Sequence, residues 1–365
     1  MENLVKEIAA KFRIDDTRLL EVKPFGNGHI NDTYRAVFSV DGENRQYIFQ
    51  RINTHVFRKP ELLMENIARV LDHSVGKLRC KPDCDRRCIH LIPTKDGRMF
   101  YLHGEECWRS YRFIDDARTY NILETENQAY HAAKAFGEFQ MLLADLPGKR
   151  LHETIPNFHN TPSRYADFER AAHENPAGRA ASCGPEIAFA RKNCWVAPIL
   201  LDFLNKGLIP ERITHNDTKL NNVLLDNKTG EGLCVIDLDT VMPGLSLYDF
   251  GDLVRTSVSP AAEDETDLSK VQVRTNIFRP LVKGYLDGAQ GCLNNKEIEL
   301  LPFSGILITY EIGLRFLTDY LNGDTYFRVK YETHNLDRCR NQFTLVQRLM
   351  EKENEMNEII KEFRK

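Results

Sequence analysis

The sequence predicts an α+β, bilobal fold, in which a small β-rich N-terminal lobe precedes a larger, mainly helical C-terminal lobe. In the first lobe, residues 33–40 alternate between apolar and polar side chains beside glycine turns, as strands do. Later, residues 129–146 and 343–363 place apolar side chains at helical spacing. At 365 residues the chain is long for one domain and sufficient for two lobes.

The lobe boundaries are expected where the sequence changes from strand-like to helical patterns of apolar residues. An apolar and aromatic segment at residues 108–114 ends in two aspartates, and long helical patterns follow it. We therefore expect the N-terminal lobe at residues 1–110, a connector at 111–116 and the C-terminal lobe at 117–365. No internal repeat or low-complexity segment interrupts this plan.

The individual elements are predicted from periodicity and turn residues. Glycines at 26 and 28 predict a turn between two strands, and Asp41-Gly42 and Asp96-Gly97 predict two more. The predicted N-terminal elements are a helix at 2–13, strands at 22–25, 33–40 and 47–50, a helix at 60–71, and strands at 89–93 and 99–102. The predicted C-terminal elements are helices at 129–146, 309–321 and 343–363, with strands at 223–225 and 234–239 joined by a turn at 227–230.

Composition excludes several classes of partner. The net charge of −4 gives no electrostatic reason to bind nucleic acid or an anionic membrane surface. No run of eighteen apolar residues predicts a transmembrane helix, and the first residues lack the apolar core of a secretory signal. We therefore expect a cytoplasmic protein whose nine cysteines are reduced. The oligomeric state, monomer or dimer, stays open.

The most informative stretch is residues 213–225, ITHNDTKLNNVLL, followed by an apolar strand that carries Asp237. Its spacing H-x-D-x-x-x-x-N, with Asp217 and Asn222, is that of a kinase catalytic loop. Phosphoryl transfer needs a carboxylate to orient the attacking hydroxyl, for which we assign Asp217. It also needs an amide oxygen and a second carboxylate to hold Mg²⁺, for which we assign Asn222 and Asp237. Asp239 is expected to assist the metal or to orient Asp237.

A glycine turn near the start of the β-rich lobe is the second expected element of this chemistry. Gly26, Asn27 and Gly28 lie between two predicted strands. Glycine lets backbone N–H groups approach phosphates closely, so we expect this turn to contact ATP.

In these motifs and in the segments given below, the chain resembles the aminoglycoside phosphotransferase and choline kinase superfamily, and within it the N-acetylhexosamine 1-kinases. The resemblance runs from about residue 20 to 350. The segments that carry it are GNGHIN (26–31), WRSYRFI (108–114), HNDTKLNN (215–222), IDLDT (236–240), MPG (242–244), DFGD (249–252), LPFSG (301–305) and RFL (315–317).

The resemblance implies a protein-kinase-like fold and ATP-dependent phosphorylation of the anomeric hydroxyl of N-acetylglucosamine or N-acetylgalactosamine. It implies an adenine site at the connector, near Tyr111, Phe113 and Asp115. The sugar would be recognised by four residues in addition to the base, namely His29, Asn31, Arg315 and Tyr326.

One departure concerns the strand lysine that contacts nucleotide phosphates in kinases. Gln50 stands in its place. Arg51 is next, but successive strand residues point to opposite faces. Lys219, two residues after the expected base, is therefore the candidate for stabilising charge on the transferring phosphoryl group. Glu65 is a candidate for the helix glutamate that would pair with a strand lysine.

Two alternatives to a sugar kinase stay open. One is the same chemistry on another alcohol, such as choline, homoserine or an aminoglycoside. The other is a nucleotide-binding protein without catalysis, which the missing lysine favours. A further motif, Cys80, Cys84 and Cys88 with His90, is more typical of free thiols than of a zinc site, because its spacing is irregular.

Overall fold

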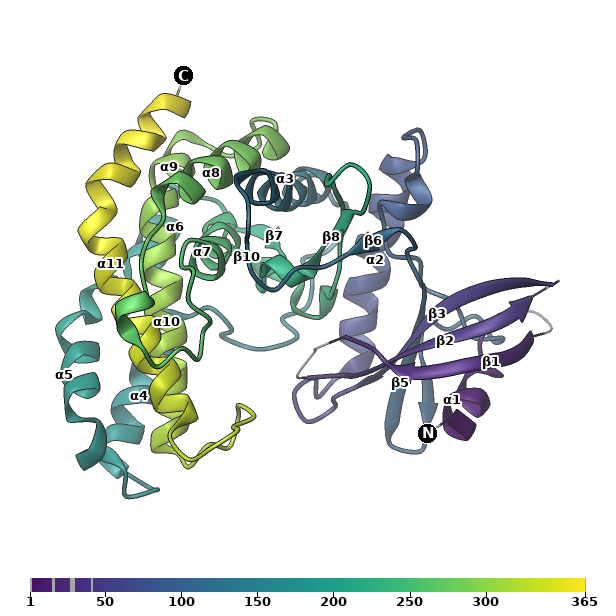
Figure 1. Cartoon of the computed structure of the whole chain (residues 1–365), viewed down its shortest axis with the longest axis horizontal. Helices are drawn as coiled ribbons and strands as arrows, with labels where there is room; N and C mark the ends of the chain where they lie inside the picture. Colours follow the sequence, from purple (N-terminus) through teal and green to yellow (C-terminus); the bar gives the residue numbers. More distant parts are fainter. Residues whose placement is uncertain (1, 15–16, 27–29, 41, 365) are drawn as a thin grey trace. The chain divides into compact units, whose positions relative to one another are not determined.

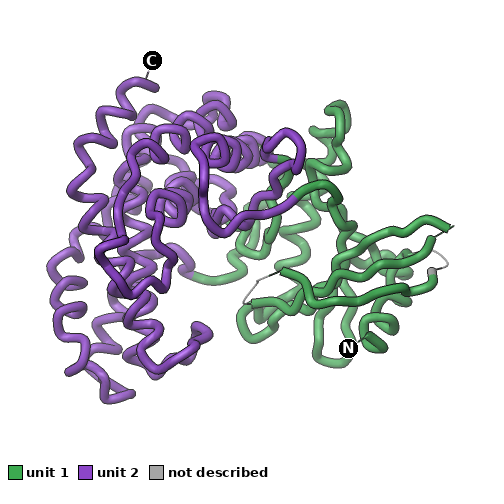
Figure 2. Tube along the Cα trace, in the orientation of Figure 1, with its two compact units in different colours: residues 1–117, 145–156, 233–242 green, residues 118–144, 157–232, 243–365 purple. Residues whose placement is uncertain are grey.

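The computed structural model describes residues 2–14, 17–26, 30–40 and 42–364. The chain divides into two compact units that interleave along the sequence (Figure 1, Figure 2). Unit 1 comprises residues 1–117, 145–156 and 233–242, and unit 2 comprises 118–144, 157–232 and 243–365. The units are defined by which residues pack together, and each is made of several segments of the chain. The predicted lobes are single continuous segments, so their boundaries stay a prediction.

Unit 1 is built on an antiparallel sheet with strand order β1-β2-β3-β5-β4. Its elements are α1 (Glu2–Ala9), β1 (Thr17–Pro24), β2 (Asp32–Val40), β3 (Glu43–Ile52), α2 (Pro60–Leu78), η1 (Cys84–Arg86), β4 (Tyr101–His103), β5 (Glu106–Arg112) and η5 (Leu238–Thr240). The short strands β6 (Ala117–Arg118), β9 (Gly232–Val235) and β10 (Met242–Gly244) lie where the chain passes from one unit to the other.

Alternating burial explains why the predicted strands form. In β2, every second residue from Tyr34 to Val40 is buried, and the residues between them are half-buried. The buried face packs with Phe49 of β3 and Ile8 of α1 in one hydrophobic core. Trp108 of β5 is fully buried there and stacks on Tyr34 with ring centroids 6.1 Å apart.

Two predicted elements of unit 1 need correction. The predicted strand at residues 89–93 is wrong, because only Leu91 forms an isolated bridge, to Tyr111. Pro93 has no N–H to extend the pairing, and its carbonyl accepts a hydrogen bond from the backbone of Arg13. The helix predicted at 60–71 continues to Leu78, which is buried.

Unit 2 is mainly helical. Its elements are α3 (Glu126–Leu143), α4 (Thr161–Glu174), η2 (Ala180–Cys183), α5 (Gly184–Lys192), η3 (Cys194–Val196), α6 (Ile199–Asn205), β7 (Arg212–Thr214), η4 (Leu220–Asn222), β8 (Val223–Asp226), α7 (Ser246–Ser257), η6 (Leu268–Lys270), α8 (Thr275–Ala289), α9 (Asn295–Glu299), α10 (Leu301–Leu321) and α11 (His334–Phe363). Nearly every residue of α10 is buried, because α4, α7 and α11 all pack against it.

Close helix packing in unit 2 depends on glycine. A Cβ atom on Gly251 of α7 would lie 2.4 Å from the carbonyl oxygen of Ser304 in α10. Only glycine therefore allows α7 to approach α10 at this point. This contact fixes the position of α7, and Asp249 in the first turn of α7 binds the backbone of residues 215 and 216.

Short strands flank that loop. The described strands include a sheet of order β6-β8-β9 and the pair β10-β7. Thus β8 and β9 are neighbours, as the predicted hairpin requires. The strand predicted at 234–239 ends earlier, at Val235, because Asp237 adopts a left-handed conformation and η5 follows it.

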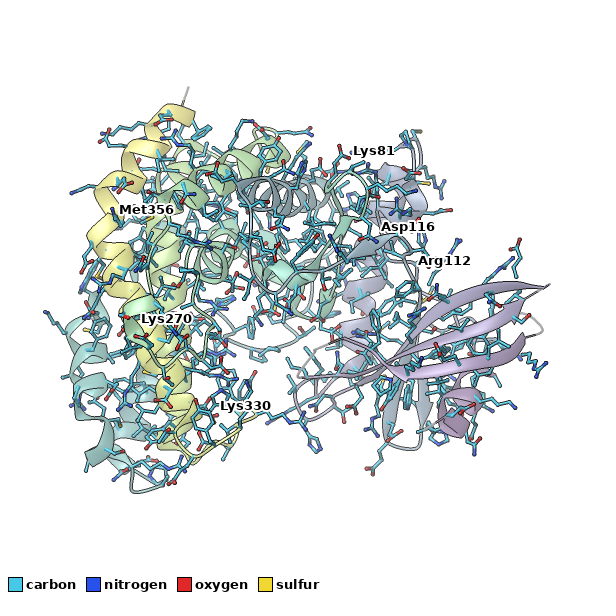
Figure 3. The ribbon with its side chains drawn as sticks, in the orientation of Figure 1. Lys81, Arg112, Asp116, Lys270, Lys330 and Met356 are labelled. Atoms are coloured by element: carbon cyan, nitrogen blue, oxygen red, sulfur yellow. The ribbon has the colours of Figure 1, made fainter. Side chains whose placement is uncertain are left out.

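Charges on the surface of unit 2 are mostly paired. Lys270 and Lys330, labelled in Figure 3, contact Glu265 at 3.0 Å and Asp264 at 2.8 Å. Exposed pairs of this kind contribute little to stability. Among the described helices, none combines the length and the apolar character needed to cross a membrane.

Candidate active site

Residues 215–219, between β7 and η4, form a loop that is anchored by a buried carboxylate. Asp249, in the first turn of α7, accepts hydrogen bonds from the backbone N–H groups of His215 (2.9 Å) and Asn216 (2.7 Å). Gln140 of α3 donates to the same carboxylate at 2.7 Å. The helix scaffold therefore fixes the backbone just before Asp217.

The next anchor is a buried histidine. His159 contacts the carbonyl oxygen of Asn216 through Nε2 at 3.0 Å and a carboxylate oxygen of Glu311 through Nδ1 at 2.7 Å. Both partners are acceptors, so both ring nitrogens must carry protons. Burial acts to lower the pKa of His159, but Glu311 outweighs it and the pKa is raised. An imidazolium thus holds Asn216 in its left-handed conformation, with φ of 64°.

Asp217 lies at the centre of this loop. Its Oδ1 is 2.7 Å from Nζ of Lys219, and its side chain is 25% exposed. Burial acts to raise the pKa of Asp217, but the charge of Lys219, helped by His215 and Arg255, holds this pKa below its usual value. Asp217 is therefore ionised at neutral pH and accessible to a substrate hydroxyl.

The side chain of Asn222 is oriented by the expected base. Its Nδ2 donates to the backbone oxygen of Asp217 at 2.8 Å and to Oδ2 of the same residue at 3.2 Å. No hydrogen bond to Oδ1 of Asn222 occurs within the described part of the chain. The amide thus offers an oxygen, the ligand type that Mg²⁺ prefers, so this residue fits the metal role.

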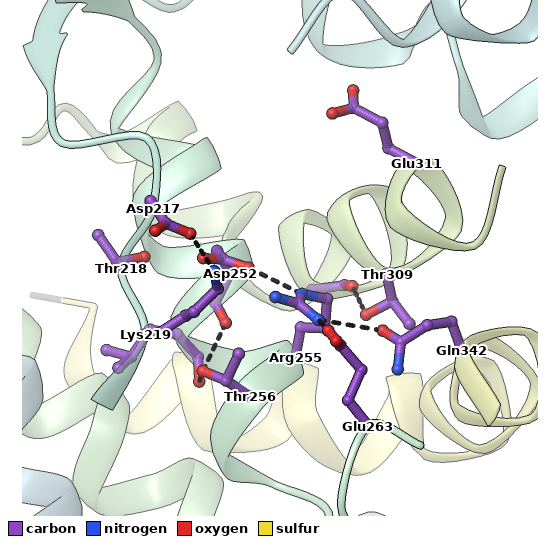
Figure 4. A network of polar contacts seen from close by, with 12 residues as sticks. Asp217, Thr218, Lys219, Asp252, Arg255, Thr256, Glu263, Thr309, Glu311 and Gln342 are labelled. Atoms are coloured by element: carbon purple, nitrogen blue, oxygen red, sulfur yellow. Dashed lines mark hydrogen bonds and ion pairs between the residues drawn. The ribbon is translucent and has the colours of Figure 1, made fainter. Parts of the chain in front are cut away.

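An ionic network centred on the buried Arg255 lies beside the loop (Figure 4). Arg255 of α7, 3% exposed, contacts Asp252 at 2.7 Å and Glu263 at 2.6 Å. Burial acts to lower the pKa of Lys219, but the negative charges of Asp217 and, to a smaller extent, Asp252 outweigh it, so this pKa is raised. The lysine is therefore a cation held among carboxylates.

In unit 1, Asp237 and Asp239, the two carboxylates expected near the metal, differ in exposure and in backbone conformation. Asp237 is exposed and has a φ of 61°, whereas Asp239 is buried inside η5. Oδ1 of Asp239 lies 2.5 Å from a guanidinium nitrogen of Arg109, and Oδ2 accepts a hydrogen bond from Nδ2 of Asn31 at 2.6 Å. Left-handed conformations of this kind in non-glycine residues are often found at functional sites.

Gln50 is also part of this group. Its Oε1 accepts a hydrogen bond from Nε of Arg109 at 3.0 Å, and its Nε2 donates to Thr33 at 3.0 Å. The expectation for Glu65 is not supported by its contacts, because this residue is exposed and contacts Nε2 of His152 at 3.0 Å.

The expected nucleotide-binding residues lie around the sheet of unit 1. Gly26 has a φ of 79°, which only glycine adopts readily, whereas Asn27, Gly28 and His29 lie outside the described residues. Tyr111 is buried on β5, and Asp115 accepts a hydrogen bond from Gln46 at 2.8 Å.

Two aromatic rings meet beside this turn. The ring of Phe113 contacts the edge of Phe25, with centroids 5.6 Å apart and planes at 78°. Phe25 is 42% exposed, whereas the guanidinium of Arg35 lies over the ring of Phe113, 5.2 Å from its centroid. The accessible aromatic surface is therefore that of Phe25, and purine bases stack on surfaces of this kind.

The expected acceptor residues of unit 2 form a separate cluster. Around the Arg315 guanidinium lie the rings of Phe158, Tyr326 and Phe327, at 5.1, 5.7 and 5.5 Å. Arg315 makes no ion pair within the described residues, because both oxygens of its helix neighbour Glu311 are engaged by His159 and Thr161. An arginine that stacks on rings without a carboxylate keeps its N–H groups available.

Sequence reasoning brought some of these residues together and missed others. Unit 2 joins Asp217, Lys219 and Asn222, as predicted. Unit 1 joins Asn31, Gln50 and Asp239 around a residue that had no predicted role, Arg109. His159 and Arg255 were also missed, because their partners are distant in sequence. The convergence of the two groups on one phosphate stays a prediction.

The chain matches the model of the phosphotransferase enzyme family, APH, over residues 21–272, which is more than half of its length. The chain belongs to this family. The predicted enzyme class, a phosphotransferase, is thereby confirmed.

Solved structures give the same fold. An aminoglycoside phosphotransferase from Alicyclobacillus acidocaldarius has a TM-score of 0.62 at 11% identity, with 98% of this chain and 96% of that chain covered. Choline kinase from Cryptosporidium parvum has a TM-score of 0.58 at 14% identity, with 96% and 95% covered. A spectinomycin phosphotransferase in complex with ADP and spectinomycin has a TM-score of 0.56 at 14% identity, with 95% and 97% covered. The predicted protein-kinase-like fold is confirmed.

The cysteine-rich segment gains no chemical role from the structure. Cys80 is exposed, Cys88 is buried, and all nine cysteines are free thiols. Among the described residues, no group of three or more His, Cys, Asp or Glu side chains is placed to hold a metal ion. The expected magnesium ligands pair an amide oxygen with carboxylates, a different donor set.

Proposed function

We propose that this phosphotransferase uses ATP and Mg²⁺ to phosphorylate the anomeric 1-hydroxyl of N-acetylglucosamine and N-acetylgalactosamine. Family membership, the ionised Asp217 and the sequence motifs at residues 26–31 and 236–240 support the kinase part. The observation that carries the choice of acceptor is the aromatic cluster around Arg315. A kinase of this type is expected in the cytoplasm, where ATP is available.

In this proposal, Asp217 orients the sugar hydroxyl. The bond between the hydroxyl oxygen and the γ-phosphorus forms while the bond from phosphorus to the bridging oxygen of ADP breaks, and Asp217 accepts the hydroxyl proton. Because the pKa of Asp217 is low, its main contribution is orientation, with proton transfer late in the reaction. Lys219 adds positive charge beside the base.

Asn222 and Asp237 would hold Mg²⁺, which neutralises phosphate charge when bound. The unengaged amide oxygen of Asn222 and the exposed carboxylate of Asp237 fit this role. The glycine turn at Gly26 and the aromatic pair of Phe25 and Phe113 would bind the phosphates and the adenine.

The charge of the Arg315 cluster favours an acceptor rich in neutral oxygen atoms. Burial, and then repulsion from Arg315, lower the pKa of Arg164, so two cations lie close together here. Choline binding needs aromatic faces for its own cation, but Arg315 already occupies these faces. Aminoglycosides are polycations and would be repelled. A hexosamine instead offers hydroxyl and acetamide oxygens that accept hydrogen bonds from arginine.

The experiment that tests this proposal is release of ADP from MgATP across a panel of acceptors. The panel contains both N-acetylhexosamines, the 1-deoxy analogue of N-acetylglucosamine, choline, homoserine and an aminoglycoside. We expect turnover with both sugars and none with the 1-deoxy analogue, because it lacks the reacting hydroxyl. Turnover with choline or the aminoglycoside alone would contradict the acceptor assignment. Absence of turnover with every acceptor would favour a nucleotide-binding protein without catalysis.

A further inference from the structure

The position of the missing strand lysine is linked directly to an arginine on the next strand. In the antiparallel register of β3 and β5, Gln50 lies opposite Arg109. Nε of Arg109 donates to Oε1 of Gln50 at 3.0 Å, and the other end of the amide is engaged by Thr33. Gln50 therefore orients Arg109. The sheet lacks a lysine at position 50 of β3, but it carries a fixed cation, Arg109, on the adjacent strand β5.

That cation is committed to Asp239. The two side chains are 1% and 4% exposed, and their charged atoms lie 2.5 Å apart. Removing one member of such a buried pair leaves an uncompensated charge, which strongly destabilises the fold around it. Asn31 donates to the second oxygen of Asp239, and Oδ1 of Asn31 accepts a hydrogen bond from the backbone of Asn53 at 3.0 Å.

The helix α2 does not supply the partner that a strand lysine would have. Met64 of α2 contacts Arg109 through its sulfur, 4.0 Å from a guanidinium nitrogen, and Glu65 is exposed. The ion pair therefore joins β5 to the segment of residues 237–239, whereas a strand lysine would join β3 to α2.

We propose that Arg109 is a positioning residue for magnesium binding: it holds Asp239 inside η5 so that Asp237, the N-cap of the same short turn, presents its carboxylate to the metal. This inference rests on the proposed function in taking Asp237 as a magnesium ligand. It assigns Asp239 to support of Asp237, because one of its oxygens forms the ion pair with Arg109 and the other accepts the hydrogen bond from Asn31. Asn31 also ties the end of the glycine turn to the metal-binding segment, and its expected contact with the sugar stays a prediction.

The test is calorimetry of ADP binding, with magnesium and with EDTA, on the purified full chain. The quantity compared is the gain in affinity that magnesium provides. Asp237→Ala sets the benchmark for its loss. Arg109→Met should lose about 10- to 100-fold of the gain, as mutations of groups that orient metal ligands do, with the affinity in EDTA unchanged.

A double variant separates positioning from stability. Arg109→Met/Asp239→Leu removes both charges of the buried pair, so it should recover the melting temperature that Arg109→Met loses. Positioning predicts that the magnesium gain stays lost in this double variant. Arg51→Met is the matched control, because Arg51 is the neighbour of Gln50 on β3 and pairs with Asp32 and Glu106, away from Asp239. It should keep the full gain.

The outcomes distinguish this inference from the proposed function. A full magnesium gain in Arg109→Met, or in the double variant if the single one does not fold, would overturn the inference. An equal loss of affinity with and without magnesium would also overturn it, because the defect would then lie in the nucleotide site. The wild-type protein could show the magnesium-dependent gain in ADP affinity and yet turn over none of the acceptors. That result would remove the sugar kinase proposal and leave this inference standing. A wild type without any gain would remove the inference together with the magnesium assignment.

Discussion

Nζ of Lys219 lies 2.7 Å from Oδ1 of Asp217, so the expected base and the expected charge stabiliser form an ion pair two residues apart. The pair keeps Asp217 ionised against the effect of its own burial. It also holds a cation beside the oxygen that would receive the substrate proton. We propose that Lys219 supplies in this loop the positive charge that the strand lysine would carry.

Replacement of Asp217 by asparagine should reduce kcat by about 10²- to 10⁴-fold, because the amide cannot accept the hydroxyl proton. Nucleotide affinity should stay close to that of the wild type, since the base is not a nucleotide ligand. Steady-state kinetics and calorimetry measure the two effects. Asp202→Asn, an exposed carboxylate of α6, is the control and should change neither. Near-native turnover of Asp217→Asn would remove the base assignment.

The roles of Lys219 and Gln50 can be ranked by kcat. Lys219→Ala should lower kcat by about 10²-fold, the scale of losing one preorganised electrostatic donor. Gln50→Ala should cost only a few-fold, because it removes one hydrogen bond to Arg109 and no charge. Single-turnover kinetics at saturating ATP provide the comparison. The reverse order would place the phosphate-binding charge elsewhere than at Lys219.

Arg315 should affect the sugar and not the nucleotide. Arg315→Ala removes a guanidinium that forms no ion pair with any described residue, so we expect the sugar KM to rise about 10- to 100-fold. The KM for ATP should stay unchanged. Lys283→Ala is the matched control, since this lysine also stacks on a ring, that of Tyr130, but is neutralised by Asp287. An equal rise in both KM values would contradict the acceptor role.

The buried pair of His159 and Glu311 predicts a pH dependence of stability. The pKa of His159 is raised above 6.5, so the stability that its protonated form provides is full below pH 6.5 and is lost as the pH rises through the raised pKa. His159→Gln should cost about 3–5 kcal/mol at acidic to neutral pH, because Glu311 is left without its partner. This difference in unfolding free energy should shrink at alkaline pH in urea titrations.

A second histidine gives a control of opposite sign. Burial lowers the pKa of His131 in α3, so protonation of this residue favours the unfolded state. The stability of the wild type relative to His131→Gln should therefore fall as the pH drops below 6.5. A difference for His159→Gln that does not depend on pH would mean that its ring is neutral.

Local patterns predicted the parts of the structure that local physics determines. The alternation in residues 33–40 and 47–50 became β2 and β3, because one face of each strand is buried. The candidate catalytic-loop residues were predicted from a spacing that covers eight positions, residues 215–222. Arg109 was not found, since its partner Asp239 is 130 positions away and each residue alone has many possible roles. The interleaving of the two units was missed for the same reason.

Phosphorus NMR of the product formed from N-acetylglucosamine and MgATP tests the central claim most directly. We expect a single phosphate on the anomeric carbon, recognised by its coupling to the anomeric proton, and the same result with N-acetylgalactosamine. We expect no such product from Asp217→Asn under the same conditions. A phosphate on the 6-hydroxyl, or no sugar phosphate while choline is phosphorylated, would contradict it.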